Sequence, residues 1–365
     1  MRISNKNKHL KGFTVLELLV AVSVTAILAG MLLNITSQVV KTQTQASGDL
    51  ETSQIAHFIL DRIQEDLHCA VYKNDGNVWM AASILEDKDN SGSWIEASYG
   101  KPTAESLRIT PSDWSDGPND LITQANNQLN LEDSRFGTGS TFLRFFTLAP
   151  ELDSQIQNTG GARAISYQII RCGLTSSSTS RPRYQLFRSD VTDVETFQAG
   201  YNLHPNSSVY SNGNNGIRKP SNITNPVFET PNGPSMDFSL AANIIDFGIR
   251  AYILEENSLG TSNLLQIFPD VNASTGGGNP PYQFMSTSNP DYLAASKPSK
   301  LFAFPHVIDV MIRVLTSEGA NALSAFEEGL LPTPSGFTPD EYWWEIAEKN
   351  SEVYTRRVKV ISQGI

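Results

Sequence analysis

The feature that most constrains this chain is an apolar run, Leu18–Leu33, that contains no charged residue. It follows the segment Lys11–Glu17, which reads KGFTVLE. From Phe13 to about Ile35 the chain is long enough to cross a bilayer as a helix, which takes about 20 apolar residues. Glu17 is the one carboxylate in that stretch. A charge at the bilayer centre costs about 2.5–3.5 kcal/mol on insertion scales, so an intramembrane Glu is a candidate functional residue.

A secretory signal or a plain membrane anchor is the simplest interpretation of such a run. A secretory signal ends its apolar core at a small-residue cleavage site. Here the small pair Ala29-Gly30 is followed by more apolar helix. A plain anchor does not account for a Gly before Phe13 and a Glu four residues after it. The pattern therefore predicts a more specialised segment.

Gly-Phe-Thr-x-x-Glu after a short basic leader, leading into a long apolar helix, resembles the class III signal of type IV pilins and type II secretion pseudopilins. The resemblance covers roughly the first 40–60 residues. It implies cleavage between Gly12 and Phe13 by a prepilin peptidase, N-methylation of Phe13, and a role for Glu17 in assembly. A buried carboxylate is tolerated where a cation reaches it. The freed amine of Phe13 on a neighbouring subunit is a candidate for that cation.

Four segments are expected: a leader at 1–12, a transmembrane and assembly helix at 13–35, an amphipathic continuation at 36–70, and a periplasmic domain at 71–365. Nothing breaks the helical pattern before residue 70, so we expect one helix from about Thr14 to about Ala70, roughly 80 Å long at 1.5 Å per residue. Its second half should pack on the domain through an apolar stripe with helical spacing, while four charged residues form the wet face. The stripe consists of Ile55, Phe58, Ile59, Ile63, Leu67 and Ala70, and the wet face of Asp61, Arg62, Glu65 and Asp66.

The domain reads as an α+β fold, in which the long N-terminal helix packs on an antiparallel sheet with long loops. Its strand-like segments are rich in β-branched and aromatic residues. They are Ser106–Thr110, Thr141–Leu148, Ala164–Cys172, Arg183–Arg188, Ile244–Leu254, Leu264–Phe268, His306–Thr316 and Tyr354–Ser362. The strict alternation in His306–Thr316 predicts a half-buried strand, and acids in the first turn with Lys349 in the last predict a helix at Pro339–Lys349.

Two pairs of segments resemble the J-type minor pseudopilins. Ala164–Ile169 and Arg183–Arg188 look like the hairpin of that group, and Ile244–Leu254 and Pro305–Leu315 stand where it has later sheet strands. The chain is longer than usual for the group, and the excess lies in its loops.

The charge distribution indicates orientation and excludes one class of partner. The net charge is −11, and without the leader's four basic residues, 23 basic and 38 acidic residues remain, a net charge of −15. Such an acidic domain argues against nucleic-acid binding. The basic leader before the apolar run predicts a single-pass inner-membrane protein with a cytoplasmic N-terminus and a periplasmic domain, which moves into a filament on assembly.

The two cysteines, Cys69 and Cys172, both lie on the expected exported side. An oxidising periplasm permits a disulfide between them, but either is equally a small buried hydrophobe.

A calcium site is a further candidate. Asp87, Asp89 and Ser91 precede Gly92 as in the first half of a calcium-binding loop. Ser98 stands where that loop requires a bidentate Glu, and a polar turn explains the same residues. No other cofactor is expected.

Enzyme signatures are missing from the sequence, which indicates that the chain is not an enzyme. Gly137–Thr141 lacks the Lys of a P-loop, and Trp343-Trp344 reads as a contact surface or, more simply, as core. The histidines are scattered and read as surface or packing residues: His9, His57, His68, His204 and His306.

The sequence thus predicts a minor pseudopilin-like structural subunit of a type II secretion pseudopilus or a related filament. The alternative is a minor type IV pilin that acts in adhesion or DNA uptake at a pilus tip. The expected partners are the prepilin peptidase, other pilin-like subunits and an inner-membrane assembly platform.

Overall fold

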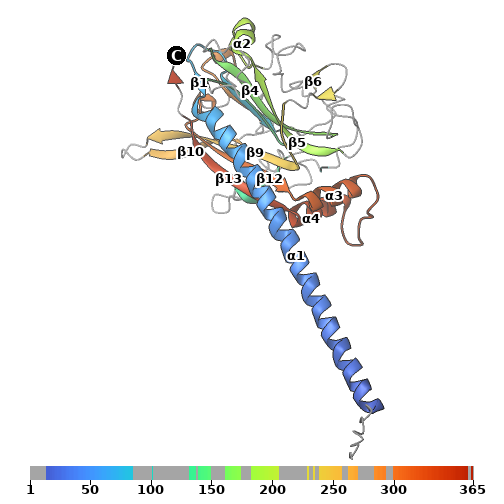
Figure 1. Cartoon of the computed structure of the whole chain (residues 1–365). Coiled ribbons are helices and arrows are strands. Elements are labelled where there is room, and N and C mark those ends of the chain that lie inside the picture. Colours follow the sequence, from blue (N-terminus) through green and yellow to red (C-terminus); the bar gives the residue numbers. More distant parts are fainter. Residues whose placement is uncertain are drawn as a thin grey trace, which may run out of the picture. The chain divides into compact units, whose positions relative to one another are not determined.

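The N-terminal part of the chain is one long helix, α1 (Val15–His68), in the computed structural model (Figure 1). The structure describes residues 14–84, 101, 131–136, 139–148, 161–173, 182–204, 228–229, 233–234, 238–256, 262–269, 283–292, 299–360 and 363–364. It contains two compact units, Met1–Glu51 and Thr52–Ile365. The first is helical throughout its described part, and α1 also supplies the first residues of the second. The prediction of a helix to about Ala70 is confirmed to within two residues.

The larger sheet of the second unit has six strands, each antiparallel to its neighbours. Their order is β11 (Gln283–Ser286), β2 (Met80–Ile84), β3 (Thr141–Thr147), β4 (Arg163–Cys172), β5 (Arg183–Val191) and β8 (Ser239–Ala242). The central strands β3 and β4 are buried along their whole length, as expected from their β-branched and aromatic composition.

The smaller sheet has four antiparallel strands. Their order is β10 (Ser262–Phe268), β9 (Ile244–Glu256), β12 (Val307–Leu315) and β13 (Ser351–Lys359). Two short pairs complete the strands: β1 (Val71–Tyr72) with β14 (Gln363–Gly364), which is parallel, and β6 (Phe228–Glu229) with β7 (Gly233–Pro234).

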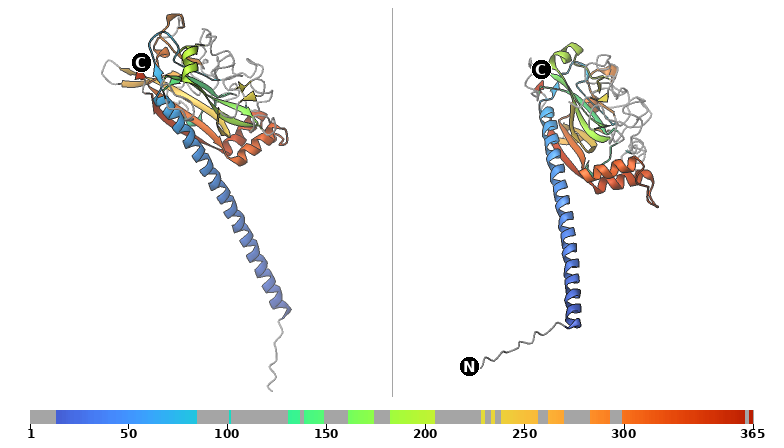
Figure 2. Two further views of the ribbon diagram at one scale, coloured as in Figure 1. Left: turned by 45° about the horizontal axis from the view of Figure 1, so that its top comes forward. Right: turned by 45° about the vertical axis from the view of Figure 1, so that its right-hand side comes forward.

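The connections carry short helices. They are α2 (Asp193–Ala199), α3 (Ser317–Glu327) and α4 (Pro339–Lys349), with 3-10 turns at Leu131–Asp133, Pro290–Tyr292 and Ser299–Phe302. In the chain, helices α3 and α4 follow β12 and precede β13, its neighbour in the sheet. The two helices lie side by side at one end of the smaller sheet (Figure 2).

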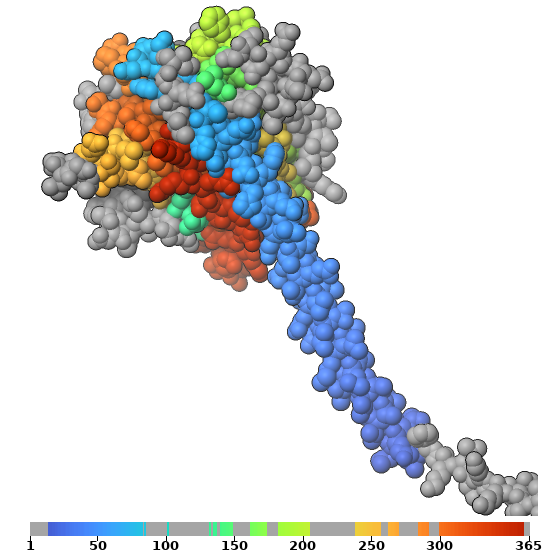
Figure 3. Space-filling model, turned by 60° about the vertical axis from the view of Figure 1, so that its left-hand side comes forward, coloured from blue at the N-terminus to red at the C-terminus, as the bar shows by residue number. Residues whose placement is uncertain are grey.

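The core lies between the two sheets and the C-terminal part of α1. The rings of Tyr167 on β4 and Phe247 on β9 lie 6.3 Å apart, centroid to centroid, across the two sheets. Ile59, Ile63 and Leu67 of α1 are fully buried in the same cluster. A space-filling view shows this part of α1 lying along the C-terminal strand β13 (Figure 3). The predicted α+β class, with a long helix on antiparallel sheet, is confirmed.

Two predictions about the amphipathic part of α1 are wrong. Phe58, assigned to the apolar stripe, is 52% exposed, because the helix turns it away from the sheets. Arg62 and Asp66, assigned to the wet face, are buried. Asp66 lies on the same helical face as Ile59 and Ile63, and its charge is compensated by Arg188 of β5, which no sequence pattern could reveal.

The predictions for the segments after α1 need three corrections. His306–Thr316 was expected to be half-buried, but Val307–Leu315 alternates only at its start and is then buried on both faces. The second face is covered by residues 131–136 and by Trp344, whose indole ring lies 5.8 Å from the Arg313 guanidinium. The last strand is Ser351–Lys359, three residues earlier than expected. The helix α3 was not predicted. Ser106–Thr110 lies outside the described residues.

Candidate processing and assembly site

The helix α1 begins with a capping box, in which the side chains at positions 14 and 17 each bond the other residue's backbone N–H. The Thr14 N–H donates to Glu17 Oε2 over 2.9 Å, and the Glu17 N–H donates to Thr14 Oγ1 over 3.3 Å. The Thr14 hydroxyl also donates to Glu17 Oε2 over 3.0 Å. This arrangement satisfies two of the backbone donors that a helix leaves open at its N-terminus. It places Glu17 one turn after the Gly12–Phe13 bond in the chain.

The signal for this capping box was present in the sequence, because Thr-x-x-Glu before an apolar run is a recognised helix start. In the sequence alone, Glu17 indicates only a role in assembly. The structure adds a local role, since the same carboxylate holds the first turn of α1. Gly12 and Phe13, the predicted processing residues, lie outside the described residues.

The apolar part of α1 has no partner within its own unit. Its large side chains are exposed, from Val15 (83%) to Ile35 (60%). Among the described residues α1 is the one helix long and apolar enough to cross a membrane. Since exposed apolar surface of this extent is unfavourable in water, it must be covered by lipid or by other protein.

The hydroxyl groups in this segment are satisfied by the helix itself. Ser23 donates to the carbonyl of Leu19 over 2.7 Å, and Thr25 donates to the carbonyl of Ala21 over 2.6 Å. Thr36 bonds the carbonyl four residues before it in the same way. These bonds hide polar groups from a bilayer, where an unpaired donor is costly.

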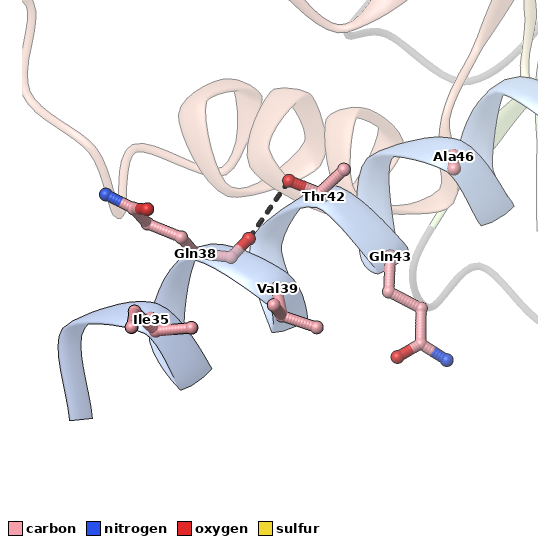
Figure 4. Close-up of a pocket in the computed structure, with 6 residues that line it drawn as sticks. All are labelled: Ile35, Gln38, Val39, Thr42, Gln43 and Ala46. Carbon is pink, nitrogen blue, oxygen red and sulfur yellow. Dashed lines mark hydrogen bonds between the residues drawn. The ribbon is translucent and has the colours of Figure 1, made fainter. Parts of the chain in front are cut away.

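Just beyond the apolar segment, one face of α1 carries an open hollow. It is lined by Ile35, Gln38, Val39, Thr42, Gln43 and Ala46, all from successive turns of the one helix (Figure 4). The Thr42 hydroxyl donates to the Gln38 carbonyl over 3.0 Å, which turns its polar group toward the backbone. The hollow is therefore a place where another helix can approach closely.

In the second unit, a buried group of charges holds α1 on the larger sheet. Asp66 accepts hydrogen bonds from Arg188 Nε at 2.7 Å and Nη2 at 3.0 Å, and from the Tyr167 hydroxyl. Arg62 lies 3.4 Å from the same carboxylate. Burial alone lowers the pKa of Arg188, but hydrogen bonding to Asp66 outweighs it and raises that pKa, so the guanidinium stays charged. Burial, with the nearby Asp66 charge, also raises the pKa of Tyr167.

A second buried carboxylate, Asp246 on β9, anchors the segment around residues 131–140. It accepts bonds from the Phe136 N–H (2.9 Å), the Ser140 hydroxyl (2.8 Å) and the Lys101 ammonium (3.1 Å). The Phe136 ring lies over Gly248, where a side chain would collide with it. Neither contact was predicted, because its partners are far apart in the sequence.

The cysteine pair does not form a disulfide. Cys69 and Cys172 are both free. Burial raises the pKa of Cys172 to about 12, and it also raises that of Cys69, so both thiols are protonated and unreactive at neutral pH. Cys172 is instead a small buried residue that accepts a bond from Gln185 over 3.2 Å.

The other candidate ligands are dispersed or lie outside the described residues. Asp87, Asp89 and Ser91 are in the second group. Within the described ranges, no three His, Cys, Asp or Glu side chains come close enough to hold a metal ion. Trp343 and Trp344 are 1% and 2% exposed, which confirms their interpretation as core.

Comparison with known proteins identifies the N-terminal segment. Residues 7–33 match the family model described as the prokaryotic N-terminal methylation motif. Searches of curated proteins and of solved structures gave no significant match. The motif together with the long apolar helix fits a type IV pilin-like protein. Proteins with this motif are structural, and the motif implies processing by a prepilin peptidase and assembly with other pilin subunits.

Proposed function

We propose that the chain is a minor pseudopilin-like subunit of a type II secretion pseudopilus or a related filament. In this function, a prepilin peptidase cleaves it after Gly12, and the new N-terminal Phe13 is methylated. Before assembly the protein is held in the inner membrane by α1, with the second unit in the periplasm. It is not an enzyme, since energy for assembly comes from other components.

The observation that carries the proposal is the helix start at Thr14 and Glu17. The methylation motif contains the start of a capped helix whose next turns expose mainly apolar side chains. A carboxylate at the first turn of such a helix needs a cation when it leaves water. The amine of Phe13 freed on a neighbouring subunit supplies one, so that helices pack side by side with Glu17 neutralised.

The hollow Ile35–Ala46 supports packing of subunits above the membrane segment. Ala46 is small and the Thr42 hydroxyl is bonded to its own helix, which permits close approach of a second helix at these two positions.

The test is to co-express the chain with a prepilin peptidase and sequence the mature N-terminus. The proposal requires Phe13 as the first residue and no processing of Gly12→Val. A different first residue, or normal processing of that variant, contradicts it. The alternative function, a minor type IV pilin in adhesion or DNA uptake at a pilus tip, is separated by deleting secretion or pilus genes and asking which deletion traps the chain in the membrane.

A further inference from the structure

The helical hairpin α3–α4 ends in an exposed apolar loop. We call Leu330, Leu331 and Phe337 the apolar tip; they are 70%, 38% and 45% exposed. Single exposed apolar residues are ordinary, but three large ones within eight residues of one loop concentrate apolar surface of the kind used for contact with a partner.

The loop that carries the apolar tip has a defined conformation. Gly329 (φ 75°) and Gly336 (φ 100°) adopt left-handed conformations at its two ends, which favour glycine. The Leu330 N–H donates to the carbonyl of Ala325 over 2.8 Å. The ring of Phe337 lies 5.9 Å from that of Tyr342 on α4, centroid to centroid. A surface ordered in advance loses little entropy on binding.

The hairpin is also firmly attached to the domain. Glu327 at the end of α3 is nearly fully buried and accepts bonds from Tyr184 (2.6 Å), Trp343 (2.8 Å) and Arg171 (2.8 Å). Because these partners come from β5, α4 and β4, the base of the hairpin is fixed on the larger sheet. The apolar tip is thus presented on a rigid support.

The charged residues of the segment that carries the apolar tip all have one sign. No Lys, Arg or His occurs between Arg313 and Lys349. Glu328 before the tip and Asp340 after it are exposed, and so is Glu345 on α4. None of these three carboxylates has an ion-pair partner in the part of the chain that the structure describes.

This combination favours a protein with basic side chains over other occupants. An anionic membrane surface repels an acidic segment. A second copy of the chain is also a poor match, because it is acidic overall, with a net charge of −11. Lys or Arg side chains on a different protein could pair with the carboxylates of Glu328, Asp340 and Glu345.

We propose that the apolar tip docks into an apolar hollow on a different protein, whose rim carries Lys or Arg side chains. The apolar contact provides affinity, and the carboxylates provide orientation and discrimination between partners. The proposal does not depend on which filament the chain joins.

The test is site-specific photocrosslinking in the membranes of cells that make the full-length chain. p-Benzoylphenylalanine replaces Leu330 or Phe337, and Leu264, an exposed leucine on β10, serves as the matched control position. The expected result is an adduct with one protein from positions 330 and 337 but not from 264. The crosslinked segment of that protein, mapped by mass spectrometry, should lie beside Lys or Arg residues.

A charge change then distinguishes docking from accidental proximity. The double variant Glu328→Lys/Asp340→Asn should reduce the adduct from position 330 about fivefold or more, because the rim charges then repel or no longer attract. Glu256→Lys, an exposed acid on β9, should leave the yield unchanged. A higher salt concentration is an independent test on the chain that keeps Glu328 and Asp340. Salt screens the attraction between charges, so it should lower the yield of the adduct from position 330.

Four results would overturn the proposal: no adduct, an adduct with lipid, an adduct only with a second copy, or a yield insensitive to both charge and salt. N-terminal processing at Gly12 is measured on the same samples. Normal processing without an adduct would contradict the docking surface while leaving the proposed filament function intact.

Discussion

Asp66 on α1 and Arg188 on β5 form a bidentate ion pair in the interior of the domain, with bonds of 2.7 and 3.0 Å. The side chain of Asp66 is fully buried and that of Arg188 is 5% exposed. The pair joins the long helix to the larger sheet. A load applied to α1 during assembly would therefore reach the domain through this contact as well as through the apolar packing around it.

Replacing Asp66 with Ala should lower the free energy of unfolding by about 3 kcal/mol, the low end for breaking a buried ion pair. The buried guanidinium of Arg188 loses its bidentate partner and, among the described residues, keeps only Asp190, at 2.6 Å. Urea denaturation of the full-length chain in detergent, followed by tryptophan fluorescence, measures the loss. Asp61→Ala is the control, since Asp61 pairs with Arg356 at the surface. Its cost should be at most about 1 kcal/mol. Equal losses of unfolding free energy in the two variants would show that the buried ion pair stabilises the domain no more than the surface pair does.

Gly248→Ala should destabilise the domain by about 1–3 kcal/mol through overpacking. A Cβ at Gly248 would lie 1.8 Å from Cε2 of Phe136. In the double variant with Phe136→Ala the collision is absent, so the double variant should cost less than the sum of the two single ones. Additive costs in the same denaturation assay would contradict the close contact.

The buried Cys172 thiol should make a contribution to stability that is lost as the pH rises above about 9. Burial raises the pKa of Cys172 from 9.0 to about 12 in the folded chain, so the unfolded chain loses its proton first. Between these two pH values the thiol lowers the free energy of unfolding by about 1.4 kcal/mol per pH unit. Below pH 9 it causes no change with pH. Cys172→Ala should flatten this part of the profile. Burial also raises the pKa of Tyr167, which adds a slope of the same sign, whereas burial lowers the pKa of Arg144 to about 9, which adds a slope of the opposite sign. An unchanged slope in Cys172→Ala would contradict the prediction.

Glu17 should be needed for its charge in addition to its hydrogen bond. Glu17→Gln can still accept the bond from the Thr14 N–H, whereas Glu17→Ala cannot. If the carboxylate pairs with a neighbouring amine, both variants should be processed normally, yet enter filaments about tenfold less or worse. Thr14→Val, which removes the capping hydroxyl and keeps the charge, should assemble. Immunoblotting of sheared filaments measures incorporation, and normal assembly of Glu17→Gln would leave the carboxylate only its local role.

Local patterns in the sequence were sufficient for the helix α1, for α4 and for most of the longer strands. These elements depend on interactions between near neighbours. Each signal lies within one segment: the repeat of apolar residues and the Thr-x-x-Glu start at Thr14 in α1, and the acidic residues of the first turn in α4. The methylation motif is likewise a short continuous segment, which is why the processing and assembly residues could be proposed at once.

Charges in the interior could not be assigned in this way. Arg62 and Asp66 look like a solvent face when only the helix is considered. The burial of Asp66 depends on Arg188, more than 120 residues later in the sequence, and similar distances separate Asp246 from Lys101 and Glu327 from Arg171. A carboxylate can be buried only where folding brings a cation or hydrogen-bond donors to it, and periodicity carries no record of that partner.

The sequence therefore established how this chain begins: a leader, a capped apolar helix and one carboxylate at its first turn. Packing settled how the helix is attached to its domain, which charged residues are inside, and that the cysteines stay free. It also placed the apolar tip on a rigid hairpin. The physical reason is the range of the interactions, since helix formation and membrane insertion depend on consecutive residues, whereas burial and charge compensation depend on partners brought together by folding.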